Sequence, residues 1–138
     1  MTKELWINLP VKDVKRSTDF FTKIGFTLNT RFPATEHSAS LLVGTKNIVV
    51  MLFAESIFQG FVNNPISNLN QGSEVLFSFD AESKEEVDEL AEKVKSAGGT
   101  IYAGPGESQG WMYSFGFIDP DRHRWNVLYM DMSKMPGM

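Results

Sequence analysis

The chain has 138 residues, no cysteine, 22% charged side chains and a formal net charge of -4. This length suits one domain with a hydrophobic core, or two small modules that share a core. The acidic balance argues against a nucleic-acid partner, and the lack of cysteine excludes disulfides, thiolate metal sites and cysteine nucleophiles.

The first part of the chain predicts a strand, a helix and three more strands. Residues 4–11 (ELWINLPV) are typical of a strand that ends near Pro10. Asp13 is a suitable N-cap for a helix whose apolar residues recur at helical spacing until Gly25. The following strands are predicted over residues 26–32, 38–44 and 48–55, the last two joined by a turn at 44–47.

Residues 56–72 show neither the helical nor the strand spacing of apolar residues and are rich in Asn, Gln and Gly. They nevertheless contain Phe58, Phe61, Ile66 and Leu69. A flexible linker does not need these apolar side chains. Two interpretations remain open: the segment packs over an opening or against a partner subunit, or it is an ordered connection.

The second part of the chain repeats the order of the first. Residues 74–80 (EVLFSFD) are typical of a strand, and a capping box of Ser83 and Glu86 begins a helix that ends at Gly98. A short strand is predicted over residues 100–102, a loop over 103–110 and a hairpin over 111–130 with its turn at 119–121.

Alternation along the last strand of this hairpin separates two sets of side chains. Trp125, Val127 and Tyr129 share one face, and Asn126, Leu128 and Met130 share the other. Asn126 is therefore either a satisfied core amide or part of a pocket floor.

The repeated order predicts an α+β fold of two βαβββ modules in one domain spanning residues 1–138. Module one covers about residues 1–55, residues 56–72 connect the modules, and module two covers about residues 73–131. Because such a unit buries little surface alone, we expect the two to pair. The N-terminus lacks signal-peptide features and no apolar run has the roughly 18 residues of a membrane helix, so we expect a cytoplasmic protein.

Three stretches carry a resemblance to a known family: INLPVKDVKRSTDFFTKIGF (7–26), VDELAEKVKSAGG (87–99) and GWMYSFGFIDPDRHRWNVLYMD (110–131). The chain resembles the vicinal oxygen chelate superfamily of glyoxalase I, bleomycin and fosfomycin resistance proteins and extradiol dioxygenases. More narrowly, it is similar to the bacterial lactoylglutathione lyase-like branch. The resemblance implies two modules that curl into a paired half-barrel around a cavity, and a homodimer.

The resemblance also implies four positions for ligands of a divalent metal, which fall near Trp6, Met51, Glu74 and Asn126. Only Glu74 is a good ligand for such an ion, whereas Zn, Ni, Fe or Mn normally needs three or more imidazole or carboxylate donors. We therefore expect a protein without the usual metal site.

The candidate catalytic residue is Glu74, which would have a raised pKa and could act as a general base if it were buried among Trp and Met; it could equally be a surface carboxylate. The candidate ligand-binding residues are Trp6, Asn8, Met51, Trp111, Tyr113 and Asn126. Aromatic residues in strands are, however, often plain core.

The two histidines are expected outside the site. His123 follows the turn at 119–121, where an exposed or turn-stabilising role is expected, and His37 is expected in a loop. They are not spaced as a metal pair.

These observations support three hypotheses. The first is a small-molecule binding protein or a lyase- or isomerase-like enzyme, in which Glu74 moves a proton. The second is a non-catalytic binder that sequesters an antibiotic or toxin, and acidic charge with exposed aromatics would suit a cationic compound. The third is a metal-dependent glyoxalase or dioxygenase with shifted ligands, recruiting His37 or Glu107.

Overall fold

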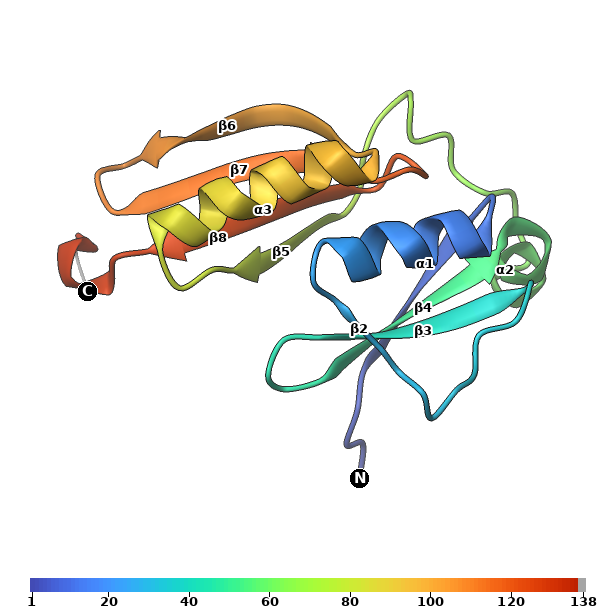
Figure 1. Ribbon diagram of the computed structural model, residues 1–138. Helices are drawn as coiled ribbons and strands as arrows, with labels where there is room; N and C mark the ends of the chain where they lie inside the picture. The colour runs from blue at the N-terminus through green and yellow to red at the C-terminus, as the bar shows by residue number, and fades with distance from the viewer. Residues whose placement is uncertain (137–138) are drawn as a thin grey trace. The chain divides into compact units, whose positions relative to one another are not determined.

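The computed structural model describes residues 1–136 (Figure 1). The chain divides into two compact units, Met1–Asn68 and Leu69–Met138, here called unit 1 and unit 2. The boundary falls inside the segment that the sequence predicts to connect the modules. Each unit is described by itself.

Unit 1 contains a four-stranded mixed sheet, and α1 lies along one face of it (Figure 1). The strand order is β1-β4-β3-β2, with β1 parallel to β4 and the other neighbours antiparallel. The core between helix and sheet includes Leu9, Val11, Phe20, Leu41 and Leu52. Its elements are β1 (Trp6–Val11), α1 (Val14–Lys23), β2 (Thr27–Leu28), β3 (Ser38–Val43), β4 (Ile48–Ala54) and α2 (Glu55–Val62).

Unit 2 repeats this arrangement, with strand order β5-β8-β7-β6 and β5 parallel to β8. Its helix covers the face that carries Phe115, Phe117, Trp125 and Val127, all of them buried. The predicted α+β class and the repeated βαβββ order are therefore confirmed. Its elements are β5 (Leu76–Asp80), α3 (Lys84–Ala97), β6 (Thr100–Ser108), β7 (Met112–Ile118), β8 (Arg124–Met130) and the short 3-10 helix η1 (Met132–Lys134).

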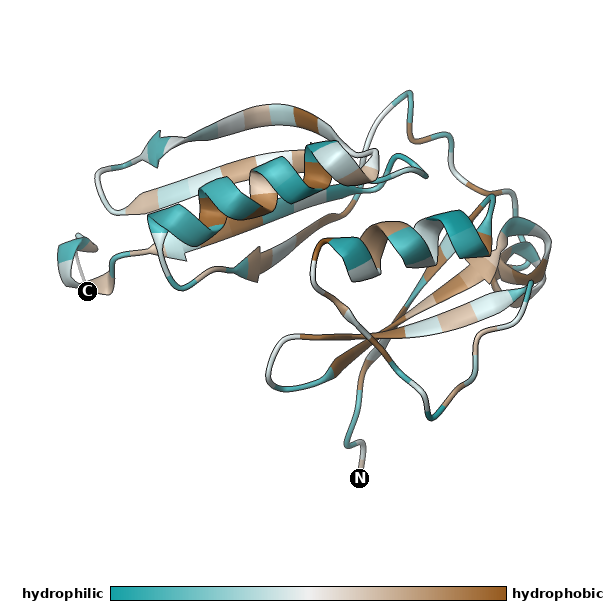
Figure 2. Ribbon diagram, in the orientation of Figure 1, coloured by the Kyte–Doolittle hydropathy of each residue, from teal (hydrophilic) through white to brown (hydrophobic). Residues whose placement is uncertain are grey.

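Local signals explain where the two long helices begin and end. The Asp13 side chain accepts a hydrogen bond from the Arg16 amide at 3.1 Å, and Ser83 Oγ accepts one from the Glu86 amide at 3.1 Å. The Glu86 carboxylate accepts from the Glu82 amide at 3.2 Å, so the predicted capping box is half formed and reaches one residue further back. Figure 2 shows hydrophilic and hydrophobic positions alternating along α3, as expected for a helix with one buried face.

Three elements differ from their predictions. The strand predicted over residues 26–32 is only Thr27–Leu28, because Asn29 begins a turn: its carbonyl accepts from the Phe32 amide and its Oδ1 from the Arg31 amide, both at 3.2 Å. The strand predicted over 100–102 extends to Ser108 through two register shifts against β7. The strand at residues 74–80 begins only at Leu76.

Residues 55–62 form α2, a helix that the sequence analysis did not predict. Its N-cap, Ala54, makes no side-chain hydrogen bond, and the helix buries none of its residues. The segment therefore lacks the side-chain N-cap that identifies the starts of α1 and α3. Among the described residues, none of the helices has the length and apolar character of a membrane span.

Candidate functional site

Each sheet has a second face that neither α1 nor α3 covers, and most of the predicted ligand-binding residues lie there. Alternation and register assign side chains to it. The first open face, in unit 1, carries Trp6, Asn8, Asn29, Ser40, Leu42, Val49, Met51 and Phe53. The second open face, in unit 2, carries Leu76, Ser78, Asp80, Ser114, Gly116, Ile118, Arg124, Asn126, Leu128 and Met130.

A row of polar residues crosses the first open face. Asn8 lies beside Met51 on the parallel neighbour, and Met51 lies beside Ser40 on the antiparallel one. Asn29 Nδ2 donates to Ser40 Oγ at 3.1 Å, and both of these residues are buried. The structure thus brings Asn8 and Met51 side by side on this face.

Trp6 begins β1 on the same face as Asn8 and remains 50% exposed. Its Nε1 donates to Glu4 Oε2 at 3.3 Å, and its ring meets the edge of Phe32 with centroids 6.1 Å apart. Half of this large aromatic side chain is therefore available to contact another molecule.

Asn126 lies on the second open face, between Ser78 on β5 and Gly116 on β7. Its side chain is half-buried, and in the part of the chain that the structure describes its amide has no hydrogen-bond partner. Asn126 is therefore not a satisfied core amide within its unit.

A cluster of Tyr102, Gly116 and Arg124 lies beside Asn126 and is not among the residues predicted from the sequence. A Cβ atom on Gly116 would come within 2.5 Å of Tyr102 Cζ, so the Tyr102 ring lies directly over this glycine. The Arg124 guanidinium carbon is 4.4 Å from the centre of the same ring. A glycine inside a strand often marks such a close approach, so Gly116 is the one feature of the sequence that indicates this cluster.

Glu74, the predicted catalytic residue, lies on a bend two residues before β5 and is exposed. The later start of the strand moves Glu74 outside the ladder. The burial among Trp and Met side chains that would favour a general base is therefore not provided within unit 2.

Tyr113 lies on the face of the second sheet that α3 covers, opposite to Asn126. Its hydroxyl donates to Asp88 Oδ1 on α3 at 2.7 Å, and this hydrogen bond raises the pKa of the phenol. Lys84 pairs with Glu107 and lies 5.8 Å from the centre of the Tyr113 ring. The sequence predicts Tyr113 and Asn126 in one site, but the register separates them because the two positions have opposite parity.

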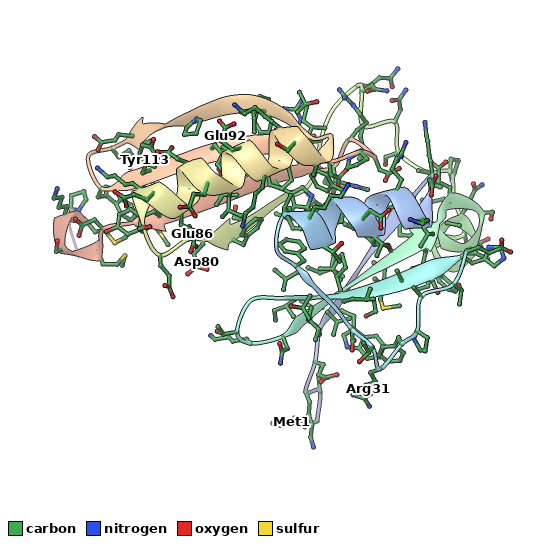
Figure 3. The ribbon with its side chains drawn as sticks, in the orientation of Figure 1. Met1, Arg31, Asp80, Glu86, Glu92 and Tyr113 are labelled. Carbon is green, nitrogen blue, oxygen red and sulfur yellow. The ribbon has the colours of Figure 1, made fainter. Side chains whose placement is uncertain are left out.

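Tyr113 instead lines an open groove of about 410 Å³ beside α3, together with Asp88, Ala91, Glu92, Lys95, Ile101, Gly104 and Pro105. Figure 3 labels Tyr113 and Glu92, from the strand and the helix that border it.

Trp111 lies in the turn before β7, and its carbonyl accepts from the Asp131 amide at 2.8 Å. Its Nε1 is buried without a hydrogen-bond partner, the one such side-chain atom within residues 1–136.

His123 is buried rather than exposed, and it stabilises the turn between β7 and β8. Asp119 is 3% exposed and its carboxylate lies 3.0 Å from His123 Nδ1 and 3.1 Å from Trp125 Nε1. The exposed alternative for His123 is therefore wrong and the turn-stabilising one is confirmed. His37 is exposed, as predicted, with Nε2 3.3 Å from the Glu36 carboxylate.

The residues at the four metal-ligand positions do not fit a divalent transition metal. The indole of Trp6 and the thioether of Met51 are not donors for such an ion, and an amide is a poor one. Over residues 1–136, no group of three or more His, Asp or Glu side chains is arranged to hold a metal.

The comparisons with known proteins agree with this fold. A model of the Glyoxalase/Bleomycin resistance protein/Dioxygenase superfamily matches residues 5–127. A hypothetical protein from S. aureus is 32% identical, with a TM-score of 0.81 over 93% of this chain and 94% of that one. No curated protein matches the chain.

Two further solved structures show the same fold at lower identity. A glyoxalase/bleomycin resistance protein/dioxygenase family enzyme from Burkholderia phytofirmans is 22% identical, with a TM-score of 0.73 over 89% of this chain and 94% of that one. The fosfomycin resistance protein FosX from Listeria monocytogenes, complexed with Mn(II) and 1S,2S-dihydroxypropylphosphonic acid, is also 22% identical, with a TM-score of 0.67 over 92% and 90%. From the family match and the repeated fold, the chain belongs to the glyoxalase/bleomycin resistance protein/dioxygenase superfamily.

Proposed function

We propose that this protein binds a small organic molecule on the open faces of its sheets. The observation that carries this proposal is the position of one amide in each unit. Asn8 and Met51 are register partners in the first sheet, and Ser78 and Asn126 are partners in the second, at the equivalent place in the repeat. Each of these equivalent pairs contains one amide, on β1 in the first sheet and on β8 in the second, which suits an oxygenated ligand.

The side chains on these faces have two roles in binding, one polar and one apolar. Asn8 and Asn126 orient a ligand carbonyl or hydroxyl, because an amide both donates and accepts hydrogen bonds. Trp6 and Met51 supply apolar contact, since pockets for small molecules are mainly apolar with a few polar groups.

Mapping of ligand contacts tests the proposal. In a titration of ¹⁵N-labelled protein with small oxygenated metabolites, we expect amide shifts on β1, β4 and β8. Asn126→Ala and Asn8→Ala should each weaken binding about tenfold, which corresponds to the loss of one or two hydrogen bonds in a partly desolvated site. Gln59→Ala removes an exposed amide on α2 and serves as the control. Ligand shifts confined to other surfaces would refute the proposal.

We propose that any reaction on this site is a proton transfer by Glu74, of the lyase or isomerase type. Glu74→Gln should then abolish turnover and leave ligand affinity within about threefold, because the isosteric amide keeps the shape and loses the base. Unchanged turnover in Glu74→Gln would remove Glu74 from this role.

A non-catalytic sequestering binder is the second candidate. The exposed position of Glu74 outside the strand favours this candidate, because an exposed carboxylate is not held in place as a general base. In that case ligand is recovered unchanged from the wild-type protein after prolonged incubation, and Trp6→Ala weakens binding.

We also propose that the protein is a homodimer. Phe61 on α2 is 64% exposed although it meets Phe53 edge-on at 5.0 Å, and Ile57 and Val62 on the same helix are exposed too. Such apolar groups favour a protein partner. Light scattering should give twice the chain mass for the wild type and a reduced mass for Phe61→Ser, and a monomeric wild type would refute the dimer.

A further inference from the structure

We infer that the ligand is an organic anion, with a carboxylate or phosphoryl group that binds Arg124 and an apolar part that lies on the second open face. This inference rests on the proposed small-molecule function and adds the charge of the ligand. It assigns a binding role to Arg124, Tyr102 and Gly116.

Arg124 is a half-buried cation in apolar surroundings. Its register neighbours are Leu76 on β5 and Ile118 on β7, and its third neighbour is the Tyr102 ring. Within the described chain no carboxylate forms an ion pair with Arg124, whereas exposed Lys15, Lys84 and Lys95 each have one. A partly desolvated guanidinium without a counterion is suited to receive an anion.

The Tyr102 ring holds this guanidinium ready for binding. At 4.4 Å from the ring centre, Arg124 is placed for a cation-π contact. A guanidinium in this position retains N–H donors for two oxygens of one carboxylate or phosphoryl group. Gly116 makes the arrangement possible, because any side chain there would displace the ring.

The neighbouring groups indicate the rest of the ligand. Leu76 is largely exposed next to Arg124, and Asn126 follows two residues later on the same strand and face. A molecule with an apolar body and a second oxygen would contact both. Asp80, the carboxylate on this face of β5, lies four residues beyond Leu76, roughly 13 Å along the strand.

The net charge of the chain led to the opposite expectation. At -4, and with exposed aromatic residues, the composition suits a cationic ligand. A ligand group bound at Arg124 meets the guanidinium at contact distance, and a charge at contact distance outweighs screened charges a Debye length away.

A set of matched probes tests the charge of the ligand. Phenylacetate and phenylphosphonate carry an anion on an apolar body, phenylacetamide is their neutral counterpart and phenethylamine their cationic one. In ¹⁵N titrations we expect the two anions to shift the amides of β5, β7 and β8 around Arg124. Phenylacetamide and phenethylamine should bind at least tenfold more weakly.

Variants of one residue complete the test. Arg124→Met should weaken phenylacetate binding at least tenfold, and Arg124→Lys should recover part of it. Lys46→Met removes the same charge from the exposed turn between β3 and β4 and should leave binding unchanged. Well-dispersed amide spectra of both variants would establish that they are folded.

The outcomes separate the two proposals. Equal binding of phenylacetate and phenylacetamide at the second open face, unaffected by Arg124→Met, would overturn the anion inference and leave small-molecule binding standing. If no probe of any charge shifts either open face, the proposed function fails, and the inference fails with it.

Discussion

Units 1 and 2 have the same strand order but differ in the chemistry of their open faces. In unit 1 the buried Ser40 and Asn29 side chains satisfy each other, and the row through Asn8 and Met51 is neutral. In unit 2 the equivalent row contains Gly116, and the space above it holds Tyr102 with Arg124. A repeated topology therefore supplies equivalent positions, while the side chains at them determine the function of each half.

The turns between the last two strands of each unit also differ in their side chains. In unit 1 the turn at residues 44–47 is exposed and closed by one backbone bond, from the Asn47 amide to the Gly44 carbonyl at 3.1 Å. In unit 2 the Asp119 carboxylate is buried and accepts from the Asp121 and His123 amides at 2.9 and 3.0 Å, besides its contacts with His123 and Trp125 side chains.

The largest expected effect comes from removing this buried carboxylate. Asp119→Ala should lower the free energy of unfolding by about 3–5 kcal/mol, because several buried donors lose their shared acceptor. Asn47→Gly in the turn of unit 1 should cost little, since Asn47 has a φ of 53° that glycine adopts freely. Urea unfolding measures both, and a loss below about 1 kcal/mol for Asp119→Ala would contradict the difference between the turns.

Two glycines of unit 2 give the next largest expected losses of stability. Gly104 has a φ of 70°, and a Cβ there would lie 2.6 Å from the Ser114 carbonyl oxygen, so Gly104→Ala should cost about 2–3 kcal/mol. Gly116→Ala meets only the far end of the Tyr102 ring, which is 40% exposed and can swing away.

Gly116→Ala should therefore cost about 1 kcal/mol or less and still weaken phenylacetate binding, because Tyr102 leaves Arg124. Thermal melts and titrations of the two alanine variants provide the measurement. An equal loss of stability in both would show that the Tyr102 ring cannot move.

Metal addition tests whether either open face holds an ion. After chelator treatment, Ni, Zn, Mn, Fe(II) and Mg added singly should leave the melting temperature unchanged, since Trp6 and Met51 are not donors. Specific binding at 100 times the dissociation constant would add about 2.7 kcal/mol. A clear shift with one transition metal would favour a metal-dependent enzyme and point to donors such as His37 or Glu107.

Among the variants, the smallest expected effect concerns Tyr113 and its bond to Asp88. Because the folded state raises the pKa of Tyr113, the stability from this bond is present below the ordinary phenol value of about 10 and is lost as pH rises through the folded pKa. Tyr113→Phe should be slightly less stable than wild type at pH 8, and this difference should shrink at pH 11. Denaturant titrations at both values measure it, and a constant difference would mean that the bond contributes no pH dependence.

Local signals in the sequence determined much of this fold. Asp13, Ser83 and Gly98 mark helix ends through contacts within a few residues, so α1 and α3 were predictable. Alternation placed Trp125 and Asn126 on opposite faces, because the period of a regular strand does not depend on its neighbours. The order of the elements then predicted the repeat.

Tertiary contacts decided what these signals could not. Tyr102 lies over Gly116 because Ile101 pairs with Phe117 and the first register shift in β6 follows, and alternation along one strand does not contain this pairing or the place of Arg124 beside the ring. The pairing of β7 with β8 places Tyr113 on the face that α3 covers. The hydrogen bonds of Asp119 hold His123 in a buried position. Caps and periods are properties of short segments, whereas these placements depend on which strands become neighbours and in what register.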